Sequence, residues 1–184
     1  MRIIAGRFRG HPLATLGKGD DKARLRPTGD RVRESLFSML EGGRFGSPVA
    51  GSRVLDLFAG TGALGFESLS RGAAHVTFVE NGRTGARLIS ENCRKLGVEN
   101  ETELLRADAC SLPENIGPPF DLVFLDPPYG QGLGEKALLN NGWISPGALV
   151  TWEENAPQSA PKGYAELDNR RYGDTHITIL EALP

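Results

Sequence analysis

Apolar and polar positions along this 184-residue chain alternate in a way that predicts strands and helices in turn. Short apolar runs are typical of buried strands, and apolar residues three and four positions apart predict amphipathic helices. Thr28 or Asp30 is the expected N-terminal cap of the first helix. We expect strands at residues 54–57, 76–79, 102–107, 122–125, 148–153, 164–172 and 176–181, and helices at residues 31–41, 63–71, 83–96 and 135–141.

This order of elements predicts an α/β fold of the doubly wound type. Strands that alternate with helices form a parallel sheet with helices on both of its faces. The last two expected strands, 164–172 and 176–181, have no helix between them, which suggests a closing hairpin.

The most informative segment is Asp126-Pro127-Pro128-Tyr129, which directly follows an apolar run. The two prolines fix φ and remove two backbone donors, so carbonyl oxygens and the Asp126 carboxylate are left as hydrogen-bond acceptors. Tyr129 adds a ring face for base stacking, which is worth roughly 1 to 3 kcal/mol. A flat ring with an exocyclic NH2 group, as in a nucleobase, fits these residues. A proline-rich turn with a helix-capping Asp126 is the structural alternative.

A glycine-rich turn lies between an expected strand and an expected helix, at Gly60-Thr61-Gly62. Gly60 and Gly62 let a ligand approach the backbone, and Gly65 lets the helix pack closely against the sheet. The spacing of these three glycines also fits the dinucleotide fingerprint. The glycines alone therefore do not separate a nicotinamide cofactor from S-adenosylmethionine.

Carboxylates close successive expected strands, at Asp56, Glu80, Asp108 and Asp126. The carboxyl ends of a parallel sheet are where such folds bind ligands. A negative charge at Asp56 favours a cationic sulfonium cofactor over a pyrophosphate. Glu80 is placed to bind ribose hydroxyls, and Asp108 could accept a hydrogen bond from an adenine amino group. Each acid could instead cap a helix or lie solvated in a loop.

Taken together, these motifs resemble the S-adenosylmethionine-dependent methyltransferases and, within them, the bacterial 16S ribosomal RNA guanine-N2 methyltransferases of the RsmD type. The resemblance covers nearly the whole chain. It also rests on residues 1–10, on residues 26–37 and on the closing Tyr172-Gly173-Asp174-Thr175. Ser38 stands where the family often has Asn, and Gly82 stands where it frequently has an acid.

The resemblance implies a Rossmann-like methyltransferase fold with a mostly parallel seven-stranded sheet and one antiparallel strand. It implies transfer of a methyl group from S-adenosylmethionine to the N2 amine of one guanine in 16S rRNA, in the small ribosomal subunit or an assembly intermediate. That guanine must be extruded from its helix or lie in a loop. The implied catalytic residues are Asp126, Pro127, Pro128 and Tyr129, and the implied cofactor-binding residues are Thr28, Asp56, Gly60, Gly62, Glu80 and Asp108.

Charge is distributed unevenly along the chain. The net charge of −2 combines +5 over residues 1–40 with −7 over residues 41–184. Clustered basic residues suit binding to phosphates, although a solvated surface segment is the alternative. We expect a single domain over residues 1–184, with a short basic N-terminal hairpin or arm at 1–27 and a cofactor-binding and catalytic core at 28–184. The expected RNA contacts are Arg2, Arg7, Arg9 and Arg31.

Composition is that of an ordinary globule, with 39% apolar and 24% charged residues. No apolar stretch reaches the roughly 20 residues that span a bilayer, and the N-terminus lacks the apolar core of a signal peptide. Cys93 and Cys110 are far apart and the three histidines are scattered, so no sequence-local metal site or disulfide framework is predicted. We expect a cytoplasmic monomer that uses no metal.

Three other functions share part of this pattern. A nicotinamide oxidoreductase would share the glycine loop but would need a second domain to hold its substrate. A non-catalytic RNA-binding module would leave residues 126–129 and the cofactor acids without a role, and cofactor titration would separate it from an enzyme. A DNA adenine-N6 methyltransferase is the nearest alternative, because an adenine amine satisfies the same acceptors.

Overall fold

The computed structural model describes residues 1–16, 29–139 and 142–184, so the predicted cap Thr28 lies outside the described residues. A seven-stranded sheet has the order β3-β2-β1-β4-β5-β7-β6, and β7 alone runs antiparallel to its two neighbours. The predicted α/β fold with one antiparallel strand is thus confirmed. The strands are β1 (Arg53–Leu57), β2 (His75–Val79), β3 (Thr102–Leu105), β4 (Phe120–Leu125), β5 (Ile144–Glu154), β6 (Tyr164–Tyr172) and β7 (Thr175–Ala182).

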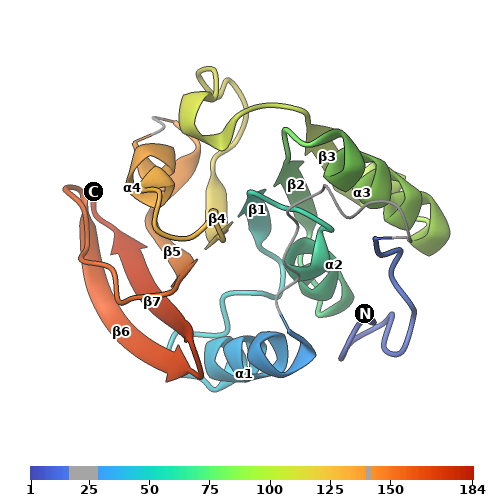
Figure 1. Cartoon of the computed structure of the whole chain (residues 1–184), viewed down its shortest axis with the longest axis horizontal. Helices are drawn as coiled ribbons and strands as arrows, with labels where there is room; N and C mark the ends of the chain where they lie inside the picture. The colour runs from blue at the N-terminus through green and yellow to red at the C-terminus, as the bar shows by residue number, and fades with distance from the viewer. Residues whose placement is uncertain (17–28, 140–141) are drawn as a thin grey trace.

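Helices cover both faces of this sheet, as Figure 1 shows. The helices are α1 (Asp30–Glu41), α2 (Ala63–Ser70), α3 (Arg83–Leu96) and α4 (Leu133–Leu138). Successive strand residues point to opposite faces. Val54 accordingly packs in the core cluster that holds side chains of α1, α2 and α3, whereas its neighbour Leu55 packs in the cluster that holds side chains of α4.

Close contact between α2 and β2 depends on Gly65. A Cβ atom at Gly65 would lie 2.3 Å from the ring of Phe78 and 2.8 Å from the side chain of Val76. Real Cβ atoms essentially never approach this closely, so the glycine is required for the packing distance. The predicted role of Gly65, to let the helix pack closely against the sheet, is confirmed.

Several predicted boundaries differ from the structure, and two of them have a clear physical reason. Gly29 is the N-cap of α1 and Asp30 lies in the first helical turn without a capping hydrogen bond, so the prediction of Asp30 as cap is wrong. An acidic residue in the first turn still interacts favourably with the positive end of the helix dipole. β5 begins at Ile144 instead of residue 148, because it continues past a register shift in its pairing with β4.

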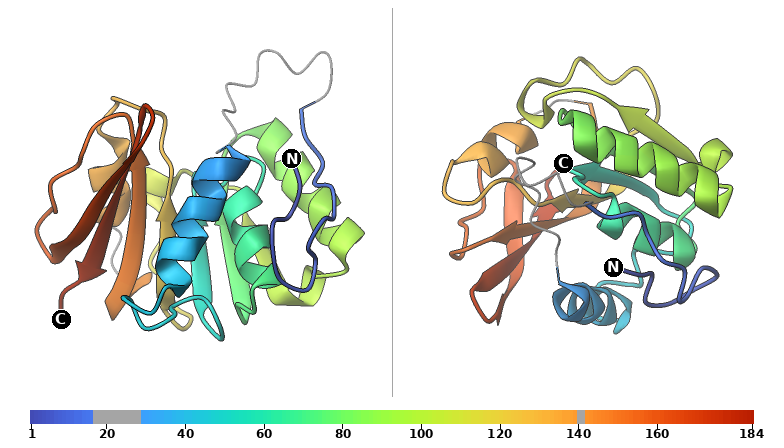
Figure 2. Two further views of the ribbon diagram at one scale, coloured as in Figure 1. Left: turned by 90° about the horizontal axis from the view of Figure 1, so that it is seen from below. Right: turned by 45° about the vertical axis from the view of Figure 1, so that its right-hand side comes forward.

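Residues 1–13 form a hairpin-like loop that packs on α2. Figure 2 shows this N-terminal segment beside α2. Arg2 and Pro12 form an antiparallel bridge. The Glu67 carboxylate, on α2, accepts the backbone N–H groups of Ile4 at 2.8 Å and Ala5 at 3.1 Å. The side chain of Glu67 is fully buried, so this part of the predicted arm is attached to the core by a buried charge.

Candidate functional site

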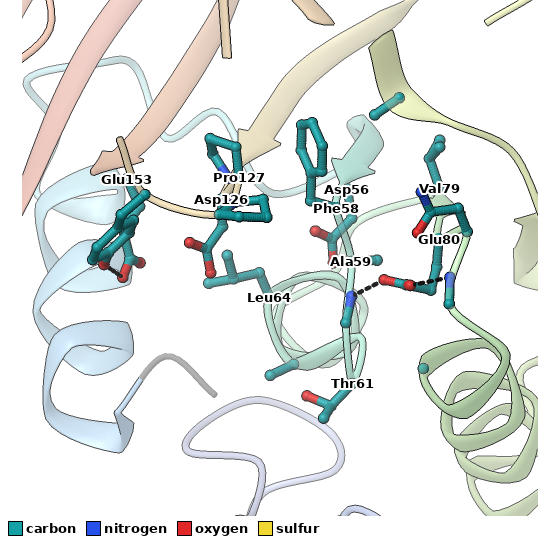
Figure 3. Close-up of a pocket in the computed structure, with 18 of the residues that line it drawn as sticks. Asp56, Phe58, Ala59, Thr61, Leu64, Val79, Glu80, Asp126, Pro127 and Glu153 are labelled. Carbon is teal, nitrogen blue, oxygen red and sulfur yellow. Dashed lines mark hydrogen bonds between the residues drawn. The ribbon is translucent and has the colours of Figure 1, made fainter. Parts of the chain in front are cut away.

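A cavity of about 1020 Å³ lies where the carboxyl ends of β1, β2, β4 and β5 meet. The loops that follow these four strands supply most of its lining, as predicted for a parallel sheet. Of the predicted site residues, those that line the cavity are Asp56, Gly60, Glu80, Asp126, Pro127, Pro128 and Tyr129. Figure 3 shows Asp56, Glu80 and Asp126 around this space, with Thr61 of the loop between β1 and α2 below them.

The turn between β1 and α2 has an unusual backbone. Phe58, Gly60 and Gly62 have φ values of 60°, 56° and 77°, in the left-handed region. Glycine adopts this region without steric cost, whereas Phe58 does so only under constraint from its surroundings. Phe58 and Gly60 line the cavity, and Gly62 is the N-cap of α2. The turn therefore brings its backbone to the edge of the cavity at Gly60, beside the side chain of Phe58.

Glu80 fixes the shape of this turn. Its Oε2 accepts the N–H of Gly60 at 2.7 Å and its Oε1 accepts the N–H of Gly82 at 2.6 Å; Figure 3 shows both hydrogen bonds. Burial raises the pKa of Glu80, and the two N–H donors act in the opposite direction. A carboxylate has about four acceptor positions, so Glu80 can hold the loop and still accept hydroxyl groups of a ligand.

Gly82 and Gly85 leave room around that carboxylate. A Cβ atom at Gly82 would lie 2.6 Å from Glu80 Oε1, and one at Gly85 would lie 2.7 Å from the carbonyl oxygen of Gly60. The glycine at 82, where the resembled family frequently has an acid, thus fits the turn that Glu80 organises in this chain.

Asp56 lies at the centre of the site but differs from the charged group that the sequence suggested. It is 2% exposed and its Oδ2 accepts the N–H of Gly65 at 3.0 Å. Burial, with a smaller contribution from the nearby charge of Glu80, raises the pKa of Asp56 to about 8. The carboxyl group is therefore mostly neutral at pH 7 in this structure. The electrostatic argument from a charged Asp56 does not apply to the protein without its ligand.

Asp108 lies next to the cavity without being part of its lining. Its exposed carboxylate accepts the N–H of Cys110 at 2.9 Å and so caps the 3₁₀ turn at Ala109–Ser111. The adjacent Ala107 and Ala109 line the cavity. Asp108 thus caps a helical turn, which was the structural alternative to binding a cofactor. Its contact with an adenine stays a prediction.

Asp126-Pro127-Pro128-Tyr129 follows β4 and forms the opposite side of the cavity from Glu80, as Figure 3 shows for Asp126 and Pro127. The Tyr129 hydroxyl donates a hydrogen bond to Glu153 Oε1 at 2.7 Å and lies 3.4 Å from Thr175 Oγ1. Burial, together with the hydrogen bond and negative charge of Glu153, raises the pKa of Tyr129. The hydroxyl therefore stays protonated and the ring orientation is fixed.

Sequence reasoning missed several lining residues on the antiparallel side of the sheet. Glu153 is the last residue of the strand that was predicted at 148–153. The rule that strand ends carry site residues, applied to this strand, would have identified it. Tyr172, Asp174 and Thr175 were quoted for the resemblance without a role in the site. All four residues line the cavity.

Three of the four predicted RNA-binding arginines gather at a second hollow, of about 470 Å³, on the outer surface. Arg2, Arg9 and Arg31 line it together with Asp30 and Glu34. Arg7 lies apart, because its guanidinium pairs with Glu101 and packs 4.6 Å from the Phe8 ring centroid. The arginines thus divide into a group of three and one that already has an acidic partner.

Within residues 1–16, 29–139 and 142–184, no group of three or more His, Cys, Asp or Glu side chains is arranged to hold a metal ion. Over the same residues, none of the helices combines the length and apolar character needed to cross a membrane.

Comparison with known proteins identifies the family. A family model described as Conserved hypothetical protein 95 matches residues 1–181. A ribosomal RNA small subunit methyltransferase D from Haemophilus influenzae is 40% identical over 182 residues, which cover 94% of this chain and 89% of that protein. The chain belongs to the RsmD-type methyltransferase family.

Other relatives agree with this membership. A ribosomal RNA small subunit methyltransferase D from Escherichia coli is 38% identical to this RsmD-type methyltransferase over 165 residues, covering 88% of the chain and 78% of that protein. The solved structure of the Escherichia coli protein yhhF superposes with a TM-score of 0.83 at 33% identity, covering 100% of this chain and 98% of that one. The fold of the whole chain is thus that of the family.

Proposed function

We propose that this methyltransferase uses S-adenosylmethionine to methylate the exocyclic N2 amine of one guanine in the 16S rRNA of the small ribosomal subunit. The observation that carries the proposal is that residues 126–129, with their acceptor groups and aromatic ring, line the same cavity as the Gly60 turn and Glu80. The names of the relatives from Haemophilus influenzae and Escherichia coli support a small-subunit rRNA substrate. A ribosomal substrate implies a cytoplasmic enzyme.

The residues around Gly60 fit a nucleoside cofactor. The backbone of the turn approaches the cavity at Gly60, which has no side chain. Glu80 offers acceptor positions at the end of β2, where nucleotide-binding folds place an acid on ribose hydroxyls. When bound there, S-adenosylmethionine would supply an electrophilic methyl group. Ala107 and Ala109 leave space for a flat ring beside Asp108. Asp56 could become charged when a cation binds nearby, because an opposite charge lowers the pKa of a carboxyl group.

The other side of the cavity fits the base. The Asp126 carboxylate and the Pro127 carbonyl would accept the two hydrogens of the guanine amine, and Tyr129 would stack on the ring. Orientation is the main contribution that we assign to these residues, since alignment of two reactants recovers roughly 7 to 11 kcal/mol of a reaction barrier. The base must leave its stack to enter the cavity, which costs a few kcal/mol in a duplex and less in a loop.

The test is transfer of labelled methyl from S-adenosylmethionine to undermethylated small ribosomal subunits, naked 16S rRNA and duplex DNA in parallel. We expect label in N2-methylguanine of a ribosomal substrate and its loss with Asp126→Ala. The ratio between subunits and naked rRNA measures whether assembly forms the target. Label in DNA adenine, or no transfer despite cofactor binding, would contradict the proposed substrate.

A further inference from the structure

The carboxylates of Glu153 and Asp126 lie at equivalent positions on neighbouring strands. β4 and β5 are parallel and Leu125 is paired with Trp152, so the next residue of each strand emerges at the same edge. Asp126 and Glu153 both line the cavity, and Figure 3 shows the two side chains beside one another and directed into it. Two acceptor groups are thus presented together to whatever occupies this end of the cavity.

Glu153 differs from the adjacent acid in how its carboxylate is used. Glu154 does not line the cavity; its carboxylate accepts the N–H of Gly130 at 3.1 Å and the N–H of Asn155 at 3.0 Å. Glu153 is 8% exposed and faces the cavity, and its Oε1 accepts the Tyr129 hydroxyl at 2.7 Å. Burial of a carboxylate is costly, so its position at the cavity wall calls for a role beyond packing.

We propose that Glu153 determines the choice of base by accepting the N1–H of the guanine whose N2 amine is held by Asp126. This inference rests on the proposed function. Guanine presents N1–H and the N2 amine as adjacent donors on its Watson–Crick edge, and flipped bases are read on that edge. Adenine presents a lone pair at N1 beside its amine. A carboxylate accepts hydrogen bonds and cannot donate them, so adenine would offer no N1–H to Glu153 and would face its carboxylate with a lone pair.

This assignment supplies a discrimination that residues 126–129 cannot make. Their acceptors are satisfied equally by the amine of guanine or of adenine, which is why a DNA adenine-N6 methyltransferase shares the sequence pattern. A site that hydrogen-bonds one group of its substrate rejects analogues lacking that group by up to about 10⁴-fold to 10⁵-fold. Glu153 is therefore inferred to be a specificity-determining residue, and Tyr129 fixes its orientation.

The test compares three small-subunit particles that differ only at the methylated base, which the labelling experiment maps first. The base is guanine, 6-thioguanine or 2-aminopurine. All three carry the amine at C2; 6-thioguanine changes the group at C6 and keeps N1–H, whereas 2-aminopurine has a lone pair at N1. We expect the wild-type kcat/KM for guanine and 6-thioguanine to agree within about tenfold, and that for 2-aminopurine to be at least about 100-fold lower.

Glu153→Gln should reduce the preference for guanine over 2-aminopurine to less than about tenfold, because a glutamine amide can donate to N1. Glu154→Gln is the matched control and should keep the wild-type preference. A role of Glu153 in packing alone would lower all rates without changing their ratio. S-adenosylmethionine binding verifies that each variant is folded.

Equal wild-type rates on guanine and 2-aminopurine would overturn the proposal without any variant, even if Glu153→Gln failed to fold. An unchanged preference in a cofactor-binding Glu153→Gln protein would also overturn it. Absence of transfer to the guanine particle by the wild-type protein would instead refute the proposed function itself.

Discussion

The Glu80 carboxylate and the backbone N–H of Gly60 form a 2.7 Å hydrogen bond that joins the end of β2 to the turn after β1. The second oxygen of Glu80 holds Gly82, at the start of α3. One buried side chain thus sets the relative position of the two loops on the cofactor side of the cavity. Glu80 therefore holds these two loops together without a bound ligand.

Glu80→Ala should weaken S-adenosylmethionine binding by at least about tenfold, or ~1.4 kcal/mol. The substitution removes the acceptors for two buried N–H groups as well as those proposed for the ribose. Isothermal titration calorimetry gives the dissociation constant. Glu103→Ala, at an exposed acid on β3 outside the cavity lining, is the control. An unchanged dissociation constant for Glu80→Ala would remove Glu80 from the cofactor site.

Asp126→Ala should abolish methyl transfer while the affinity for S-adenosylmethionine stays within a few fold of the wild-type value. The reason is that Asp126 is assigned to the base and the Gly60 turn to the cofactor. Single-turnover transfer and cofactor titration measure the two properties separately. Asp121→Ala, at an exposed acid at the start of β4, should keep both. Equal losses of turnover and cofactor affinity in Asp126→Ala would refute the assignment of Asp126 to the base and of the Gly60 turn to the cofactor.

The buried Asp56 should make the protein less stable as pH rises. Its pKa is about 8 in the folded state against an ordinary value of 3.8, so the folded state binds more protons than the unfolded state between these values. Stability then falls as pH increases from about 4 to about 8 and changes no further above that range for this group.

Asp56→Asn should remove this contribution, because the amide oxygen can still accept the Gly65 N–H and the side chain has no charge to desolvate. Melting temperatures of the two proteins at pH 5 and pH 8 measure the difference. We expect the variant to gain stability relative to wild type at pH 8 more than at pH 5. The same pH dependence in both proteins would show that Asp56 does not titrate as assigned.

Neutralisation of Arg9 and Arg31 should raise the KM for small ribosomal subunits by about tenfold. It should also reduce the slope of log binding constant against log salt concentration by roughly one for each phosphate group that is no longer neutralised. These side chains line one hollow, which favours joint binding to an RNA backbone. Arg7→Ala should have a smaller effect, because Arg7 already pairs with Glu101. Arg170→Ala, at an exposed residue of the edge strand β6 outside this hollow, is the control. If KM and salt slope do not change, these arginines do not bind RNA.

Glu67→Ala should lower the free energy of unfolding by about 3 to 5 kcal/mol, the usual cost of removing one partner of a buried ion pair. Glu67 binds Arg71 Nε at 2.7 Å as well as the N–H groups of Ile4 and Ala5, and Arg33 lies 3.8 Å away. Urea denaturation followed by the fluorescence of the buried Trp143 and Trp152 gives the value. Exposed Glu166→Ala should change it by less than about 0.5 kcal/mol. A similarly small change for Glu67→Ala would show that the N-terminal segment is held by its other contacts.

The sequence alone determined the order of the elements and the site residues that follow β1, β2 and β4. Apolar periodicity specifies strands and helices locally, and glycines and prolines mark the turns between them, so the Gly60 turn, Glu80 and residues 126–129 could be assigned from neighbouring residues. The tertiary structure alone decided how distant residues combine. Pairing of β4 with β5 brings Glu153 beside Asp126, and β7 brings Thr175 near the Tyr129 hydroxyl. Burial decided the protonation state of Asp56. Desolvation depends on every element packed around a group, so it cannot be predicted from the neighbouring residues in the sequence.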